Sequence, residues 1–231
     1  MSGIFFDSAN LVDFRRWFDA GILGGATTNL VILQKEGVLD LPGHISKMIE
    51  ISGENFPISI EVPDSEMPRK EMIELALRYR DRFPRNAVIK IPMDPREPEK
   101  AFEVMCRLRR EGVKLNATLG LSTGQLIGAM ETGAEYVSLF WGRCEEARGS
   151  GAEATLITAL KYRETHNLKS KIIIGSIRNI NQIDKAFSLG ADIVTISPKL
   201  IAEWMFTERG VETVKEFNEA YRSVKEQMKL I

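Results

Sequence analysis

Short apolar runs recur along the chain, and each is followed by a longer segment whose apolar residues return every three or four positions. The short runs are typical of buried strands, and the longer period is typical of amphipathic helices. The pattern predicts eight strands: Ile4–Phe6, Gly21–Ala26, Pro57–Val62, Ala87–Ile91, Lys114–Leu119, Tyr136–Phe140, Lys171–Gly175 and Asp192–Ile196. It also predicts helices between them, among which are Arg69–Arg82, Pro98–Glu111, Thr123–Thr132 and Ala152–Thr165.

Eight strand–helix units favour an α/β protein with a single closed (β/α)8 TIM barrel over an open, doubly wound sheet. An open sheet of that kind usually carries a glycine-rich phosphate loop after its first strand, whereas the polar segment DSAN follows the first apolar run here. The sequence contains no linker-like or low-complexity tract, so we expect one barrel domain over residues 1–231.

A charged amphipathic segment, Val211–Leu230, follows the eighth unit and is predicted to be an extra C-terminal helix. Its apolar residues form one stripe, made of Val214, Phe217, Ala220, Tyr221, Val224 and Met228. We expect the stripe to pack on the barrel or on a neighbouring subunit, and the sequence leaves both possibilities open.

The charge balance excludes a long-range field that would attract nucleic acid or an anionic membrane, because 31 Lys and Arg residues face 32 Asp and Glu residues. An anionic ligand must therefore be held by a local site. The first residues lack both the basic region of a signal peptide and the start of a membrane span, so we expect a cytoplasmic protein.

Cysteine and histidine are scarce. Cys106 and Cys144 have no neighbours at metal-ligand or redox-motif spacing, which argues against a disulfide framework. His44 and His166 lie in polar or Pro/Gly-containing surroundings and are expected at the surface. They leave little room for a histidine-based catalytic triad or metal centre, and we expect no metal site.

Lys90 breaks the apolar pattern of the fourth predicted strand. Because side chains alternate along a strand, Val88, Lys90 and Pro92 are expected to face the barrel axis. Desolvation there favours the neutral amine, which can attack a carbonyl and form a Schiff base. A lysine paired with a buried carboxylate is the alternative, and the sequence alone does not decide between them.

Two carboxylates stand at the carboxyl ends of strands, where barrel enzymes build their active sites. Asp7 ends the first strand, and the alternative role for it is as the N-cap of the next helix. Glu61 lies near the end of the third strand and shares a face with Ser59, so Glu61 is interior if Ser59 is.

Uncharged polar residues occupy further strand ends, namely Thr27, Thr28, Asn29, Asn116, Thr118 and Ser138. Singly, such residues are usually buried hydrogen-bonding groups. Around one lysine they would form a pocket for carbohydrate hydroxyl groups.

Basic residues follow the sixth and seventh strands, namely Arg143 and Arg178, with Ser176 between them. Loops at this part of a barrel mouth commonly bind phosphate, and two guanidinium groups with a hydroxyl suit a sugar phosphate. Surface salt bridging is the alternative for each arginine.

Seven segments, each at a strand end, together resemble the transaldolase family of Schiff-base-forming class I aldolases, and especially its short members, which include fructose-6-phosphate aldolases. In chain order they are FFDSAN, GGATTN, ISIEV, VIKIP, LNATLGLS, VSLFWGR and GSIRN. The resemblance covers essentially the whole chain.

The resemblance implies a role for each matching residue. Lys90 would attack the keto carbon of the donor sugar, Asp7 would act as acid and base in carbon–carbon cleavage, and Glu61 and Thr118 would position a water. The residues implied in substrate binding are Asn29, Thr28, Asn116, Ser138 and Phe140, and those implied in phosphate binding are Arg143, Ser176 and Arg178. The imine itself accepts the electrons, so the resemblance implies no cofactor.

The resemblance also bears on activity and assembly. In the family's aldolases the positions of Glu61 and Phe140 hold Gln and Tyr, and Asn116 also matches transaldolases better, which favours a transaldolase of the pentose phosphate pathway. A fructose-6-phosphate aldolase, a non-catalytic sugar-phosphate-binding protein and a Schiff-base-free isomerase stay open. Short family members form pentamers or decamers, so the resemblance implies a homo-oligomer without nucleic-acid or membrane partners.

Three residues depart from the family pattern. Leu30 stands where many members have Pro, which alters the loop after the second strand. Trp141 and Cys144 flank Arg143 and are unusual there, which predicts a shifted acceptor preference.

Overall fold

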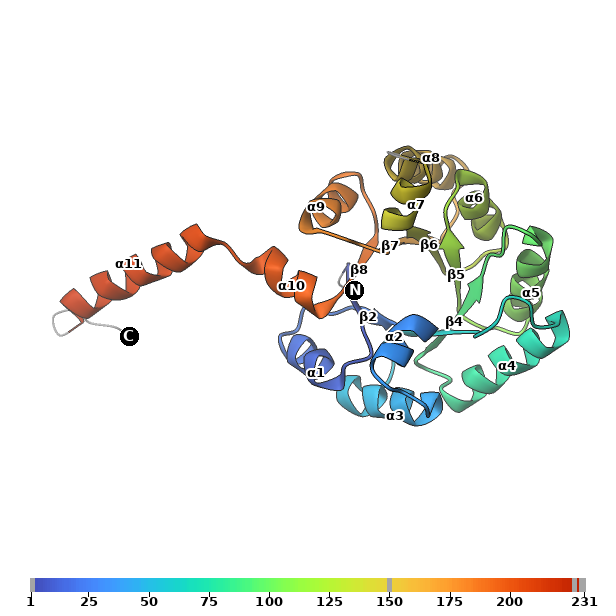
Figure 1. The fold of residues 1–231 in the computed structure, drawn as a ribbon, viewed down its shortest axis with the longest axis horizontal. Coiled ribbons are helices and arrows are strands. Elements are labelled where there is room, and N and C mark those ends of the chain that lie inside the picture. The colour runs from blue at the N-terminus through green and yellow to red at the C-terminus, as the bar shows by residue number, and fades with distance from the viewer. Residues whose placement is uncertain (1–2, 149–150, 226–227, 229–231) are drawn as a thin grey trace. The chain divides into compact units, whose positions relative to one another are not determined.

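The protein, described here by a computed structural model that covers residues 3–148, 151–225 and 228, contains a closed barrel of eight parallel strands. Each strand pairs with the next along the chain, and β8 pairs with β1. The helices between residues 11 and 188 lie around this ring of strands (Figure 1). The predicted (β/α)8 fold class is confirmed.

The strands lie close to the predicted runs. Their bounds are β1 (Ile4–Asp7), β2 (Gly25–Thr27), β3 (Ile58–Glu61), β4 (Ala87–Pro92), β5 (Leu115–Gly120), β6 (Tyr136–Phe140), β7 (Lys171–Gly175) and β8 (Ile193–Ile196). Only β2 departs clearly, because it begins at Gly25 instead of Gly21. Gly21 has φ +75°, a turn conformation that strand residues do not adopt.

Helices follow the strands, and several of them begin at a side-chain cap. The bounds are α1 (Leu11–Asp19), α2 (Leu30–Lys35), α3 (Leu41–Ser52), α4 (Arg69–Arg82), α5 (Pro98–Arg110), α6 (Thr123–Glu131), α7 (Trp141–Arg148), α8 (Gly151–Thr165), α9 (Ile180–Ser188), α10 (Pro198–Met205) and α11 (Glu208–Val224). Asn10, Asn29, Ser122 and Asn179 each accept a hydrogen bond from a backbone N–H in the first turn of α1, α2, α6 and α9.

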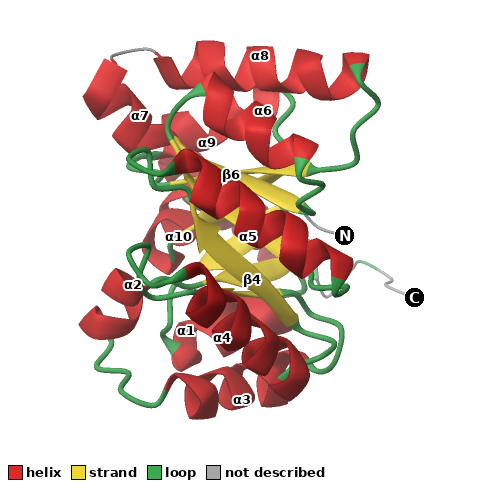
Figure 2. Cartoon of the chain, turned by 90° about the vertical axis from the view of Figure 1, so that its right-hand side faces the viewer, coloured by secondary structure: helices red, strands yellow, loops and turns green. Residues whose placement is uncertain are grey.

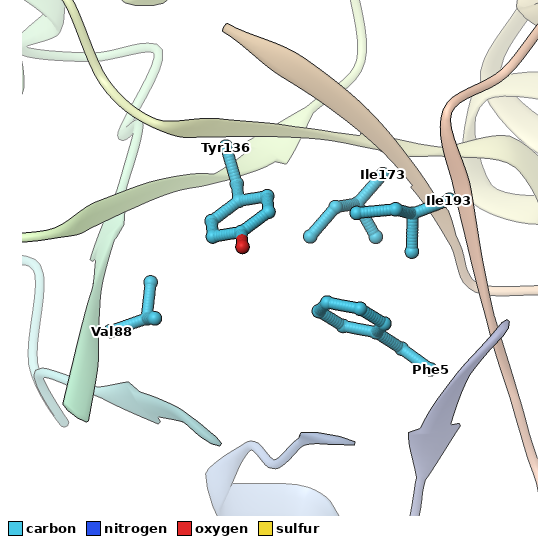
Figure 3. Packing of buried hydrophobic residues seen from close by; sticks show 5 residues of the cluster. All are labelled: Phe5, Val88, Tyr136, Ile173 and Ile193. Atoms are coloured by element: carbon cyan, nitrogen blue, oxygen red, sulfur yellow. The ribbon is translucent and has the colours of Figure 1, made fainter. Parts of the chain in front are cut away.

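A cluster of apolar side chains, here called the apolar plug, fills the barrel interior toward the amino ends of the strands. Its side chains come from five strands and point toward one another in Figure 3; they are Phe5, Val88, Tyr136, Ile173 and Ile193, all almost fully buried. The rings of Phe5 and Tyr136 meet edge to face with centroids 5.9 Å apart. A Cβ at Gly25 would lie 2.4 Å from the Phe5 ring, so glycine at that position makes room for the plug.

The outward-facing side chains of the strands form a second apolar layer beneath the helices. Figure 2 shows α4 and α5 lying over β4, whose Ile89 and Ile91 are fully buried. On the other side of the barrel Phe6 packs on Phe14 of α1, with ring centroids 5.4 Å apart. The two layers together explain why β4 is buried along its whole length.

The chain divides into two compact units, Met1–Pro198, which holds the barrel, and Lys199–Ile231, which holds α11. The predicted C-terminal helix begins three residues earlier than expected and ends at Val224, and Leu230 lies outside the described residues. None of the described side chains of α11 is buried, and Val214, Phe217 and Tyr221 of the predicted stripe are exposed.

Two smaller sequence predictions have different outcomes. His166 is exposed and stacks on Tyr162, as expected for a surface residue. His44 is only half-exposed: its Nε2 is buried without a hydrogen-bond partner in the described structure, and burial lowers the pKa of its imidazole. No helix within the described residues is both long and apolar enough to cross a membrane.

Candidate active site

A polar layer lies directly above the apolar plug. Because alternate residues of a strand share a face, the side chain two positions beyond each plug residue also points inward, about 6.6 Å further along. These five residues are Asp7, Lys90, Ser138, Gly175 and Thr195, and all of them line one cavity of about 280 Å³. The cavity therefore opens at the carboxyl end of the barrel, where this fold places its active sites.

Lys90 lies at the floor of this cavity with its side chain only 4% exposed. Its Nζ donates a hydrogen bond of 2.8 Å to the backbone carbonyl of Thr28 and lies 2.9 Å from Oε2 of Glu61. Glu61 and Lys90 are register partners on β3 and β4, which places the two side chains next to each other. Lys90 is thus interior, as expected, and it is paired with a carboxylate, which was the structural alternative to a Schiff-base role.

Asp7 lines the same cavity from β1. Its Oδ1 accepts a hydrogen bond of 2.8 Å from the Thr27 hydroxyl. Burial raises the pKa of the Asp7 carboxyl, while the Thr27 hydrogen bond and the charge of Lys90 act in the opposite direction. The cap of α1 is Asn10, so the alternative role of Asp7 as a helix cap is wrong.

Glu61 and Thr118 each hold a buried polar atom that lacks an aligned partner. Within the described structure, neither Oε2 of Glu61 nor Oγ1 of Thr118 makes a hydrogen bond. The contact of Glu61 with Lys90 is therefore an ion pair by distance without the alignment of a hydrogen bond. Buried polar atoms are nearly always satisfied, so both oxygens are available to a bound molecule or water.

A buried network supports Ser138 from below. Asn116 is fully buried, donates through Nδ2 to Ser59 Oγ at 3.2 Å and accepts from Ser138 Oγ at 2.7 Å. The interior position of Ser59 confirms the expectation that it shares a face with Glu61. The side-chain oxygen of Asn116 is occupied by the Ser138 hydroxyl. The position of Asn116 therefore fixes the direction of that hydroxyl group.

Cationic side chains dominate the cavity lining. Lys35, Lys90, Arg143 and Arg178 line it together with a single carboxylate, that of Asp7. Arg143 is exposed, and its guanidinium lies 5.4 Å from the centre of the Phe140 ring. This local excess of positive charge suits an anionic ligand, although the whole chain is close to neutral.

The segment beside these arginines has an unusual backbone. Ser176 has φ +58°, in the left-handed region that non-glycine residues seldom occupy. Its carbonyl accepts a hydrogen bond of 3.0 Å from the Gly142 N–H, and a Cβ at Gly142 would lie 2.4 Å from that oxygen. The start of α7, which carries Arg143, and the segment after β7, which carries Arg178, are thus held in close contact.

Comparison with known proteins decides the family. The family described as transaldolase/fructose-6-phosphate aldolase matches residues 4–230. A probable transaldolase of Clostridium botulinum is 34% identical over 222 residues, covering 94% of this chain and 97% of the relative. A probable transaldolase of an Exiguobacterium species is 32% identical over 211 residues, covering 90% of this chain and 93% of the relative.

The chain belongs to the transaldolase/fructose-6-phosphate aldolase family. Among solved structures, a flavocytochrome b2 variant with sulfite bound has a TM-score of 0.58 at 16% identity, over 97% of this chain and 64% of that one. A mandelate oxidase variant has a TM-score of 0.54 at 16% identity, over 89% of this chain and 64% of that one. These likenesses show the barrel fold alone.

Seen as a transaldolase-family site, the cavity brings together most of the residues singled out in the sequence. Those that line it are Asp7, Asn29, Lys90, Ser138, Phe140, Arg143, Ser176 and Arg178. Glu61, Thr28, Thr118 and Asn116 are absent from its lining, and the first two instead contact Lys90 directly. Asn29 uses its side-chain oxygen to cap α2, which leaves its amide group to face a ligand.

Three polar residues that line the cavity were missed in the sequence, namely Lys35, Thr195 and Ser197. Thr195 lines the cavity from β8, and its signal was a lone polar residue alternating with apolar ones in Ile193–Ile196. Lys35 reaches the cavity from the last turn of α2, and a lysine at a helix end gives no local signal of this kind. Within the described residues, no group of three or more His, Cys, Asp or Glu side chains is arranged to hold a metal.

The residues that depart from the family pattern have structural roles. Trp141 is buried, and its Nε1 donates to Glu145 at 2.7 Å. Glu145 also accepts from Gln182 Nε2 at 2.6 Å, which ties α7 to α9. Cys144 is buried, and its Sγ lies 3.4 Å from the Leu121 carbonyl. Leu30 occupies the first position of α2, where a helix needs no proline.

Proposed function

We propose that this protein is a transaldolase that forms a Schiff base through Lys90. It would move a dihydroxyacetone unit from a ketose phosphate, such as fructose 6-phosphate or sedoheptulose 7-phosphate, to an aldose phosphate. One observation carries the proposal: the amine of Lys90 lies at the floor of a cation-lined cavity that Asp7 also lines, with Glu61 at 2.9 Å. No other described lysine combines such burial with a place in this cavity.

The first step joins the donor to the enzyme. Lys90 first passes a proton to the neighbouring Glu61 carboxylate, and the resulting amine adds to the keto carbon. Return of that proton to the new hydroxyl group releases water and leaves an iminium ion. Glu61 lies 2.9 Å from the Lys90 amine, and the buried Thr118 hydroxyl makes no hydrogen bond within the described structure. Both observations support the proposed role of these two residues in holding the water that leaves or enters.

The second step breaks a carbon–carbon bond. The Asp7 carboxylate takes the proton of the donor's hydroxyl group, the electrons of the broken bond move to the iminium nitrogen, and an aldose phosphate leaves. An enamine then remains on Lys90. The raised pKa of Asp7 supports this role, since it brings the carboxyl closer to the operating pH, where a group can both accept and return a proton.

The third step transfers the fragment. The enamine carbon attacks the aldehyde carbon of the acceptor, and Asp7 returns its proton to the new hydroxyl group. Water then releases the product and restores the amine of Lys90. Asn29, Ser138 and Phe140 line the part of the cavity next to Lys90, while Arg143, Ser176 and Arg178 supply the donors that we assign to phosphate.

Reductive trapping tests the proposal. Borohydride added with fructose 6-phosphate should fix a three-carbon fragment on the peptide that contains Lys90, as read by mass spectrometry. Lys90→Met should abolish the adduct. Lys100→Met is the matched control, because Lys100 is equally buried but hydrogen-bonds to the Ser65 carbonyl away from the cavity lining. An unmodified wild-type peptide would overturn the Schiff-base mechanism.

The same assay separates the remaining alternatives. Binding of fructose 6-phosphate without trapping or turnover would identify a non-catalytic sugar-phosphate-binding protein. Turnover that survives in Lys90→Met would point to an isomerase. Dependence on erythrose 4-phosphate supports transfer, whereas rapid release of free dihydroxyacetone without an acceptor would identify an aldolase.

We further propose that the protein acts as a cytoplasmic homo-oligomer in carbohydrate metabolism. The exposed apolar stripe of α11, with Phe217 70% exposed, supports burial of this helix against another subunit. Sedimentation of the wild type and of Phe217→Glu should show loss of assembly in the variant. A monomeric wild type would exclude the oligomer.

A further inference from the structure

A chain of hydroxyl groups leads from Asp7 across the floor of the cavity. Thr27 Oγ1 donates to Asp7 Oδ1 at 2.8 Å and lies 2.6 Å from Thr195 Oγ1. Thr27 and Thr195 are 3% and 5% exposed, so solvent competes little with these bonds. Strands β2 and β8 do not pair with each other, and their two hydroxyls meet in front of β1, which lies between them.

Counting hydrogens fixes the direction of this chain. A threonine hydroxyl has one hydrogen to donate, and that of Thr27 goes to Asp7. Thr27 therefore has none left for its second contact, so Thr195 is the donor in the pair of threonines. Each hydroxyl polarises the next, and the bond received by the carboxylate is strengthened by the one behind it.

We infer that Thr195 is a positioning residue for Asp7: its hydroxyl orients that of Thr27, and the direction of both bonds reverses when Asp7 gains a proton. A protonated Oδ1 becomes a donor to Thr27, and Thr27 then donates to Thr195. In the reversed state the Thr195 hydrogen is released into the cavity that Thr195 lines, where a bound substrate or water accepts it. Asp7 can therefore take and return a proton while Thr27 stays paired on both sides. This inference rests on the proposed role of Asp7 in proton transfer.

Several charged groups also act on Asp7 and must be separated from the threonines. Lys90 of β4 favours the ionised carboxylate, and Glu61 of β3 disfavours it. Lys35 of α2, Arg143 of α7 and Arg178 line the same cavity at its rim. Replacing Thr195 changes none of these charges, so a shift in the titration of Asp7 would report the hydroxyl chain itself.

The test is the pH dependence of kcat/KM, whose acid limb should follow the ionisation of Asp7. Thr195→Val removes the hydroxyl at nearly constant volume and should move this limb upward by about half a pH unit. Thr27→Val, which removes the direct bond, should move it further in the same direction. Thr195→Ser keeps a hydroxyl group at this position and should leave the acid limb at its wild-type pH.

Controls distinguish positioning from structure and from direct substrate binding. Thr132→Val removes a hydroxyl of similar burial that donates to Ala129 at the opposite end of the barrel, and it should leave the limb in place. The shift should persist in a Glu61→Gln background, which removes the other carboxyl group that acts on Asp7. A lower rate or higher KM in Thr195→Val without a shift of the limb would overturn the inference, as would failure of Thr195→Ser to restore it.

A second measurement does not depend on activity. Thr195→Val should change the pH dependence of the melting temperature between pH 4 and pH 7 in the wild type but not in an Asp7→Asn background. The same change in both backgrounds would overturn the inference. If Thr195 and Asp7 stay coupled in this measurement but borohydride traps no adduct on Lys90, only the proposed function is overturned. If Thr195→Val does not fold, Thr195→Ala serves in both measurements, since it also lacks the hydroxyl.

Discussion

Lys90 and Glu61 form a nearly buried ion pair, with Nζ 2.9 Å from Oε2 and side chains 4% and 17% exposed. The pair stands on neighbouring strands in register, so the backbone fixes the two charges side by side. Removing water from two charges costs free energy that their attraction offsets only while both are present. The pair therefore makes the site stable as a unit and sensitive to the loss of either member.

The first prediction concerns that dependence. Lys90→Met leaves the Glu61 carboxylate beside Asp7 without its cation and should lower the free energy of unfolding by about 3 kcal/mol. Adding Glu61→Gln should recover a large part of this loss, because the double variant buries no unpaired charge at the pair. Urea denaturation followed by circular dichroism measures both. Additive losses would show that the two residues are not coupled.

The second prediction concerns the ionisation of Asp7. Because burial raises the pKa of this carboxyl in the folded protein, the folded state binds a proton that the unfolded state has already released. Stability is therefore lost as the pH rises from 3.8 through the raised pKa. Asp7→Asn should raise the melting temperature at pH 7, and its advantage should shrink toward acid pH while transfer activity is lost. An advantage independent of pH would contradict this assignment.

The third prediction concerns the contact between the start of α7 and the segment of Ser176, to which we assign phosphate binding. Gly142→Ala places a Cβ 2.4 Å from the Ser176 carbonyl and must displace one of these two segments. The KM for fructose 6-phosphate should rise by about tenfold, the effect expected when positioned charged hydrogen bonds are lost. Gly124→Ala is the matched control, since nothing lies within 4 Å of its Cβ. Equal KM values in the two variants would contradict the assigned phosphate site.

The fourth prediction concerns the charges at the cavity rim. Arg178 forms an exposed ion pair of 3.1 Å with Glu146, which competes with an incoming phosphate. Glu146→Gln should lower the KM for phosphorylated substrates by about threefold, and Lys35→Gln should raise it by a similar factor. Both effects should weaken in high salt and be absent with unphosphorylated dihydroxyacetone. Equal changes in KM for phosphorylated and neutral substrates would show that these charges do not recognise phosphate.

Much of the fold follows from local patterns. The run Tyr136–Phe140 and the helix Arg69–Arg82 lie where the sequence places them, because apolar periodicity reports burial of one face. The second strand was predicted four residues too early because Ile22 and Leu23 look like strand residues. The turn at Gly21 rules out that extension, and its positive φ is not visible in a short window of sequence.

The candidate site likewise has features that the sequence predicted and features that only the tertiary structure decided. Alternation along Ala87–Pro92 by itself turned Lys90 inward, and the run ending at Asp7 placed a carboxylate at the same end of the barrel. Only closure of the barrel decided that Lys90 pairs with Glu61 and that Thr195 reaches Thr27 across β1. The direction of a side chain is a local property of its strand, whereas the distance between side chains on different strands depends on how the whole sheet is registered and closed.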